Sequence, residues 1–127
     1  VDTYSYSQIG TGMTESSGIF SFPSTGIYRI DFYATSLTSG GSTGFLRGDI
    51  DHTEDNGTYN TASVGYSGIY TDGAYSNISI FSIFDVTNVS THKVRFELGQ
   101  NSSATPIFTG STSQTRTSAL FTRLGDT

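Results

Sequence analysis

The segment from Gly18 to Phe32 constrains the fold more than any other part of the chain, because it predicts two strands and a tight turn between them. Phe20 and Phe22 lie two residues apart, so an extended backbone places both rings on one face. Pro23 fixes its own φ and Gly26 leaves its φ free, which suits a sharp reversal. The second strand alternates strictly, with one face formed by Tyr28, Ile30, Phe32 and Ala34 and the other by Arg29, Asp31 and Thr35. This period of two has no helical alternative and predicts a hairpin.

The rest of the chain repeats this pattern without helical segments. Tyr, Phe, Ile and Thr favour pleated surfaces, and abundant Gly, Ser and Asn favour turns. Further strands are predicted at Phe45–Asp51, Tyr59–Gly65, Ser76–Val86, Val94–Leu98 and Thr117–Leu124, whereas Tyr66–Ala74 has no clear assignment and Thr38–Gly44 and Gly99–Thr105 have loop composition. With the hairpin this gives eight or so antiparallel strands, the number in a jelly-roll sandwich. The 127 residues suffice for one domain, residues 1–127. Because the chain starts at Val1 without an initiator Met, we expect it to be a processed product or a part of a longer chain, such as its C-terminal head.

Two predicted strands carry apolar residues on both faces. In Ser76–Val86, one face has Ile78, Ile80, Phe84 and Val86 and the other has Phe81 and Ile83. In Thr117–Leu124, Ala119 and Phe121 alternate with Leu120, Thr122 and Leu124. A strand of a two-layer sandwich needs only one buried face, so the second row is expected to lie under a long loop or against another subunit, and we favour the subunit.

The spacing Gly-x-Phe-x-x-Pro-x-x-Gly-x-Tyr-x-Ile-x-Phe from Gly18 to Phe32 resembles the signature of the complement globular-head and tumour-necrosis-factor-like family. The resemblance implies an all-β, antiparallel jelly-roll sandwich that forms homotrimers. The residues expected to lie between subunits are Tyr33, Phe81, Ile83 and Phe121.

The low cationic content, the missing cysteines and the closing segment Phe121–Asp126 resemble the small heads that tailed bacteriophages carry on fibres and capsid decorations. The resemblance implies a non-enzymatic viral structural protein, located in the virion or outside cells, which binds other virion proteins and a glycan or protein of the host surface. We expect the loops around Gly40, Asn56 and Asn101 to make the host contact.

A secreted carbohydrate-binding module or bacterial adhesin is the alternative, because exposed tyrosines stack on sugar rings. Its candidates are Tyr59, Tyr66, Tyr70 and Tyr75: a coplanar exposed row would favour sugar binding, and interdigitation between chains would favour assembly. An extracellular signalling ligand would share the same fold.

The charge distribution limits the partners of this chain. Six Lys and Arg, a net charge of −5 and a pI of about 4.6 argue against a nucleic-acid partner. No apolar run reaches the roughly 20 residues of a membrane span, so we expect no membrane insertion. With no cysteine, disulfides and thiolate chemistry are excluded.

Four acidic residues lie close together at Asp49, Asp51, Glu54 and Asp55, and such oxygen ligands suit Ca²⁺. The competing interpretation is a solvated acidic loop. Apart from this calcium site we expect no cofactor. Only His52 and His92 offer an imidazole base, and neither lies in a nucleophile motif, so catalysis is not expected.

Overall fold

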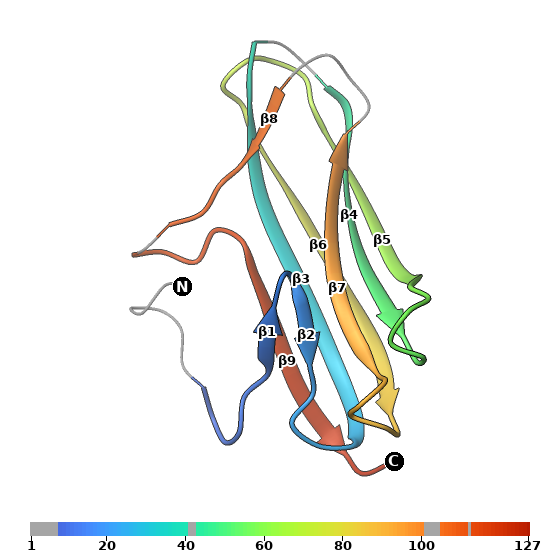
Figure 1. The fold of residues 1–127 in the computed structure, drawn as a ribbon. Coiled ribbons are helices and arrows are strands. Elements are labelled where there is room, and N and C mark those ends of the chain that lie inside the picture. The colour runs from blue at the N-terminus through green and yellow to red at the C-terminus, as the bar shows by residue number, and fades with distance from the viewer. Residues whose placement is uncertain (1–7, 41–42, 101–104, 112) are drawn as a thin grey trace.

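The computed structural model describes residues 8–40, 43–100, 105–111 and 113–127, which form two antiparallel sheets packed as a sandwich (Figure 1). The first sheet has five strands, in the spatial order β1 (Thr14–Ser16), β2 (Ile19–Ser21), β7 (Lys93–Gln100), β4 (Thr43–Thr53) and β5 (Asn60–Ile69). The second contains β6 (Tyr75–Val86), β3 (Gly26–Ser39), β8 (Thr105–Phe108) and β9 (Ser118–Gly125). The all-β prediction is confirmed. Over the same residues there is no helix with the length and hydropathy needed to span a membrane.

The strand pairs are nested in the sequence. β4 pairs with β5, β3 pairs with β6 outside them, and β2 pairs with β7 outside those. Such nesting is what a long two-stranded ribbon has, with the β4–β5 hairpin at its tip. The remaining pairs are β1 with β2, β4 with β7, and β3 with both β8 and β9. The chain therefore passes repeatedly from one sheet to the other.

β8 and β9 share one edge of β3 and are separated by an excursion of the chain at residues 109–117. The backbone of Thr35 pins both ends: its carbonyl accepts from the Thr109 N–H at 2.8 Å, and its N–H donates to the Arg116 carbonyl at 3.1 Å. The Thr117 hydroxyl also donates to the Thr109 carbonyl at 2.9 Å. The edge of β3 is thus paired with β8 after Thr35 and with β9 before it.

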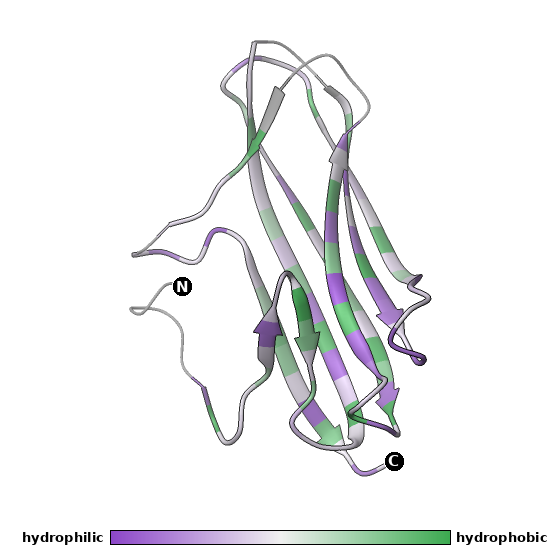
Figure 2. Cartoon of the chain, in the orientation of Figure 1, coloured by the Kyte–Doolittle hydropathy of each residue, from purple (hydrophilic) through white to green (hydrophobic). Residues whose placement is uncertain are grey.

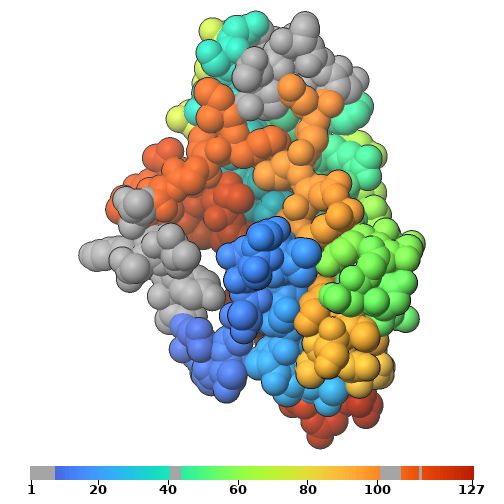
Figure 3. Space-filling view, in the orientation of Figure 1, coloured from blue at the N-terminus to red at the C-terminus, as the bar shows by residue number. Residues whose placement is uncertain are grey.

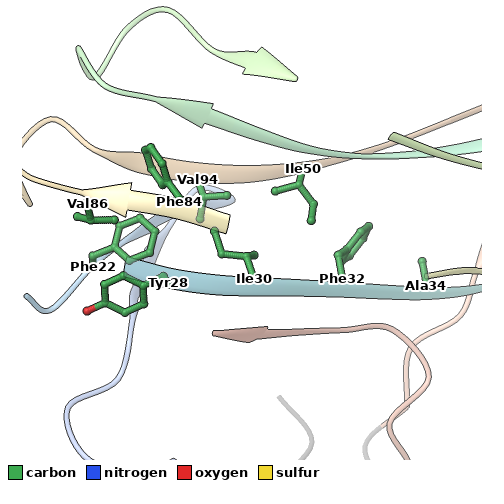
Figure 4. Close-up of a cluster of buried hydrophobic side chains, with 9 residues drawn as sticks. All are labelled: Phe22, Tyr28, Ile30, Phe32, Ala34, Ile50, Phe84, Val86 and Val94. Carbon is green, nitrogen blue, oxygen red and sulfur yellow. The ribbon is translucent and has the colours of Figure 1, made fainter. Parts of the chain in front are cut away.

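The core lies between the sheets and follows the predicted alternation. Figure 4 shows Tyr28, Ile30, Phe32 and Ala34 in a row along β3, facing Ile50 and Val94 of the other sheet. A second buried cluster contains Leu46, Ile69 and Ile78. In Figure 2 hydrophobic and hydrophilic residues alternate along β7, as expected for a strand with one buried face. The inner faces predicted for β3 and β6 are confirmed.

The turn from Pro23 to Gly26 differs from the predicted hairpin. β2 pairs with β7 and β3 pairs with β6, so the turn carries the chain across the sandwich. Gly26 is required there, because its φ is 145° and an added Cβ would lie 2.6 Å from the Gly125 carbonyl oxygen.

Three further strand segments differ from the sequence analysis. β5 continues through Tyr66 to Ile69, a stretch that had no clear assignment, and β1 and β8 were not predicted. Gly65 of β5 lies against Ile80, since an added Cβ would be 2.5 Å from its Cγ2 atom. This glycine within a strand therefore marks a close approach of the two sheets.

Candidate functional site

The outer surface of β6, β3 and β9 exposes large apolar side chains. Phe81 and Ile83 of β6 are 55% and 52% exposed, and Leu120 of β9 is 59% exposed. Phe81 and Leu120 lie on either side of Asp31 of β3. Tyr33 follows two residues later on the same face of β3. We call the surface formed by Tyr33, Phe81, Ile83 and Leu120 the apolar face. Large apolar side chains gathered on an exposed surface are typical of an interaction site.

One ion pair lies within the apolar face. The Arg29 guanidinium donates to the Asp31 carboxylate at 2.7 Å and also lies 4.6 Å above the centre of the Phe81 ring. The hydrogen bonds and charge of Asp31 raise the pKa of Arg29. The pair leaves this face without net charge, and the guanidinium covers part of an aromatic ring.

Phe121 does not lie where the sequence analysis places it. Its ring packs inside the sandwich, with centroids 5.4 Å from Phe20 and 6.0 Å from Phe96. The register of β9 with β3 sets Phe121 beside Ile30, on the inner side, and turns Leu120 outward. Phe121 is therefore a core residue, and Leu120 replaces it on the outer surface. The same alternation already grouped Leu120 with Leu124, which is also exposed at the end of β9.

The outer surface of β7, β4 and β5 is built of charged side chains instead. We call the surface formed by Arg47, Asp49, Asp51, Arg95 and Glu97 the charged face. Arg47 and Asp49 are paired at 2.7 Å along β4. Arg95 bridges Asp51 of the neighbouring strand at 3.1 Å and Glu97 of its own strand at 2.8 Å. Its guanidinium also lies over the Tyr59 ring.

The predicted calcium residues do not converge. Asp49 and Asp51 are each only 4% exposed, and each is paired with an arginine on the charged face. Asp55 lies in the β4–β5 loop, where its Oδ1 atom accepts from the Thr58 and Gly57 N–H groups. Glu54 is exposed next to it. In the part of the chain that the structure describes, no group of three or more His, Asp or Glu side chains is arranged to bind a metal ion.

The four candidate tyrosines are split between surfaces. Tyr66 is exposed on the charged face, with its ring edge against Phe45, and Tyr59 lies beneath Arg95 on the same side. Tyr75 begins β6 opposite Leu37, on the outer side of the other sheet. Tyr70 is 92% exposed just after β5. They do not form one coplanar row.

The candidate loops also lie apart. Gly40 follows the end of β3, where its N–H donates to Asp72 Oδ1 at 2.7 Å. Asn56 lies in the β4–β5 loop at the opposite end of the sandwich (Figure 1). Asn101 lies outside the described residues. A single surface cannot include both Gly40 and Asn56 without extending along the whole domain.

His52 joins the two sheets near the β4–β5 loop. Its ring stacks on Phe84 with centroids 4.0 Å apart, and its Nε2 atom lies 3.0 Å from the Ser82 hydroxyl. Burial lowers the pKa of His52 to about 4, despite the nearby Asp51 charge. An open pocket of about 720 Å³ adjoins it, lined also by Glu54, Asp55 and Asp85. Stacked on Phe84 and hydrogen-bonded to Ser82, the His52 ring packs between the two sheets.

Comparison with known proteins does not identify a relative: no family model matches the chain, and no curated protein matches it.

Proposed function

We propose that this chain is a non-enzymatic structural domain of a bacteriophage, a tumour-necrosis-factor-like jelly roll that assembles as a homotrimer through its apolar face. In this proposal it forms the head of a fibre or a capsid decoration, and contacts other virion proteins and the host surface. The observation that carries the proposal is the exposed row of Phe81, Ile83 and Leu120 on an otherwise complete sandwich.

The strand order supports the jelly-roll part of the proposal. Nested pairs β4–β5, β3–β6 and β2–β7 are what a long ribbon gives when it wraps into two facing sheets. The Gly18–Phe32 motif that resembles the family supplies β2, the crossing turn and the first half of β3. Its aromatic residues fill the core, with Phe22 and Tyr28 rings 4.7 Å apart.

A second copy of the same chain is the partner that the apolar face suits. Burying Phe81, Ile83 and Leu120 removes apolar area from water and stabilises association. The Arg29–Asp31 ion pair on this face is already neutral within its own chain, so it adds no net charge where identical faces meet. Burying the charged face would instead desolvate the exposed charges of Arg47, Arg95 and Glu97.

The carbohydrate-binding alternative gains less from the structure. It requires exposed aromatic rings on one surface, and Tyr66 and Tyr75 lie on opposite outer sides of the sandwich. Tyr59 is covered by the Arg95 guanidinium.

The molar mass in solution tests the proposal, measured by light scattering behind a sizing column over a range of concentrations. We expect three copies of the 13.6-kDa chain. A well-folded monomer at all concentrations would overturn assembly through the apolar face. Binding of the trimer to purified virions or host envelopes, with the monomeric variant described below as control, then tests the proposed location.

A further inference from the structure

The β4–β5 loop contains the only Asn-Gly pair of the chain, Asn56-Gly57. Both residues are exposed, and Asn56 has a φ of 61°, in the left-handed region. In Figure 3 this loop, coloured green, lies on the surface beside the yellow-orange loop between β6 and β7. The contact includes a hydrogen bond of 3.0 Å from the Asn56 N–H to the Thr91 carbonyl.

An Asn-Gly pair can rearrange without an enzyme, since glycine has no Cβ to obstruct the ring closure. The Gly57 backbone nitrogen loses its proton and attacks Asn56 Cγ, so that a new C–N bond forms. The bond from Cγ to Nδ2 breaks, and the amide nitrogen leaves as ammonia. Water then opens the five-membered imide, giving aspartate or isoaspartate. The sum is one amide and one water converted to one carboxylic acid and one ammonia.

The folded loop opposes the first step of this reaction. The Gly57 N–H that would have to lose its proton donates to Asp55 Oδ1 at 2.9 Å. An amide anion at that distance from a carboxylate would be strongly repelled. The hydrogen bond also directs the nitrogen toward Asp55, and Asn56 itself is anchored to Thr91.

Hydrogen bonds from neighbouring groups favour the ionised form of Asp55 in this position. Its Oδ1 atom also accepts from the Thr58 N–H at 2.7 Å and the Thr53 hydroxyl at 2.8 Å. These bonds, that from Thr58 foremost, keep the pKa of Asp55 well below its usual range. The carboxylate is therefore charged wherever the reaction is fast enough to matter.

We propose that Asn56 is a site of spontaneous deamidation and that the Asp55 carboxylate, through its hydrogen bond to the Gly57 N–H, slows the reaction in the folded protein. Deamidation adds one negative charge beside the acidic pocket that contains Glu54, Asp55 and Asp85. The site does not depend on assembly through the apolar face.

The test compares Asp55→Ala with Glu54→Ala during incubation at pH 8 and 37 °C. Both variants lose one carboxylate in the same exposed loop, but only Asp55 contacts Gly57. Peptide mapping by mass spectrometry follows the gain of about one mass unit at Asn56 and separates isoaspartate from aspartate. We expect Asp55→Ala to react about tenfold faster than wild type, as loss of a charge-assisted hydrogen bond allows, and Glu54→Ala to react at the wild-type rate.

A second measurement keeps the proposal falsifiable if Asp55→Ala does not fold. Wild-type protein is incubated folded and in 6 M guanidinium chloride at the same pH, and we expect the folded protein to react at least about tenfold more slowly. An Asp55→Ala rate equal to or below wild type would overturn the proposal. Equal rates for folded and unfolded wild type would overturn it as well.

Discussion

The two outer faces of the sandwich differ in whether their side chains find partners within a single chain. On the charged face, Arg47 and Arg95 are each paired with acidic neighbours, of which Asp49 and Asp51 are almost fully buried. On the apolar face, Phe81, Ile83 and Leu120 are more than half exposed. The charged face is complete in a single chain, since its side chains satisfy one another. The apolar face gains stability only when something covers it.

The largest expected effect is on assembly. Phe81→Asp places a charge at the centre of the apolar face, next to Asp31 on the neighbouring strand. In a buried subunit contact an unpaired charge destabilises by about 3–5 kcal/mol, enough to convert a trimer into monomers at micromolar concentration. Because the side chain is exposed in the single chain, the monomer should remain folded by circular dichroism.

Tyr66→Asp is the matched control, because it introduces the same charge at an exposed aromatic residue of the charged face. Light scattering should give the wild-type mass for this variant. Assembly through the apolar face is wrong if Phe81→Asp keeps the wild-type mass, or if both substitutions dissociate the assembly equally.

A smaller effect separates the two rows of β9. In the Phe81→Asp background, Phe121→Ala should lower the free energy of unfolding by about 2–4 kcal/mol, because its ring packs on Phe20, Phe22 and Phe96. Leu120→Ala in that background should change it by less than about 0.5 kcal/mol. Urea unfolding measures both. A Leu120 loss as large as the Phe121 loss would mean that the monomer buries the outer row.

These two rows also show what the sequence can predict. Alternation with a period of two identified the inner residues of β3 and β6 because their other faces carry polar side chains or fewer apolar ones. In β9, Phe121 and Leu120 are both apolar, so the pattern gives two rows without saying which is inside. The register with β3 decides this, and register depends on the whole sheet.

Other features depend on contacts between distant segments. Gly65 and Gly48 lie in paired strands where Ile80 and Ile78 approach closely. This close approach depends on how two segments distant in the sequence pack together, so it cannot be predicted from either segment alone. The acidic cluster failed to converge for a related reason: Arg95, which pairs with Asp51, comes from β7.

The third effect is a pH dependence of stability that arises from His52, which lies between the two sheets. Because His52 has a pKa of about 4 in the fold and an ordinary value when unfolded, the unfolded state binds more protons between these values. Stability is therefore complete above about pH 6.5 and declines as the pH falls toward 4. We expect a loss of about 1–2 kcal/mol, less than the full shift implies because the ring is partly solvated.

His52→Gln isolates this contribution. Carboxylates titrate in both proteins, so the measured quantity is the wild-type stability minus the variant stability at each pH, from urea unfolding. The difference should decrease from pH 6.5 to pH 4 and then level off. A difference that does not change with pH would show that protonation of His52 does not lower the stability of the fold.

The smallest expected effect is that of calcium on the charged face. To bind Asp49 and Asp51, the ion would have to displace Arg47 and Arg95, whose charges already neutralise these buried carboxylates. Asp51 Oδ1 has no hydrogen-bond partner in the described structure, but it is enclosed and is a single oxygen where calcium takes six to eight. Millimolar calcium or excess chelator should therefore shift the melting temperature by less than about 1 °C. A rise of several degrees with calcium that is lost in Asp51→Asn would instead show that the arginines yield to the metal, and that the charged face is a binding site and not a self-contained surface.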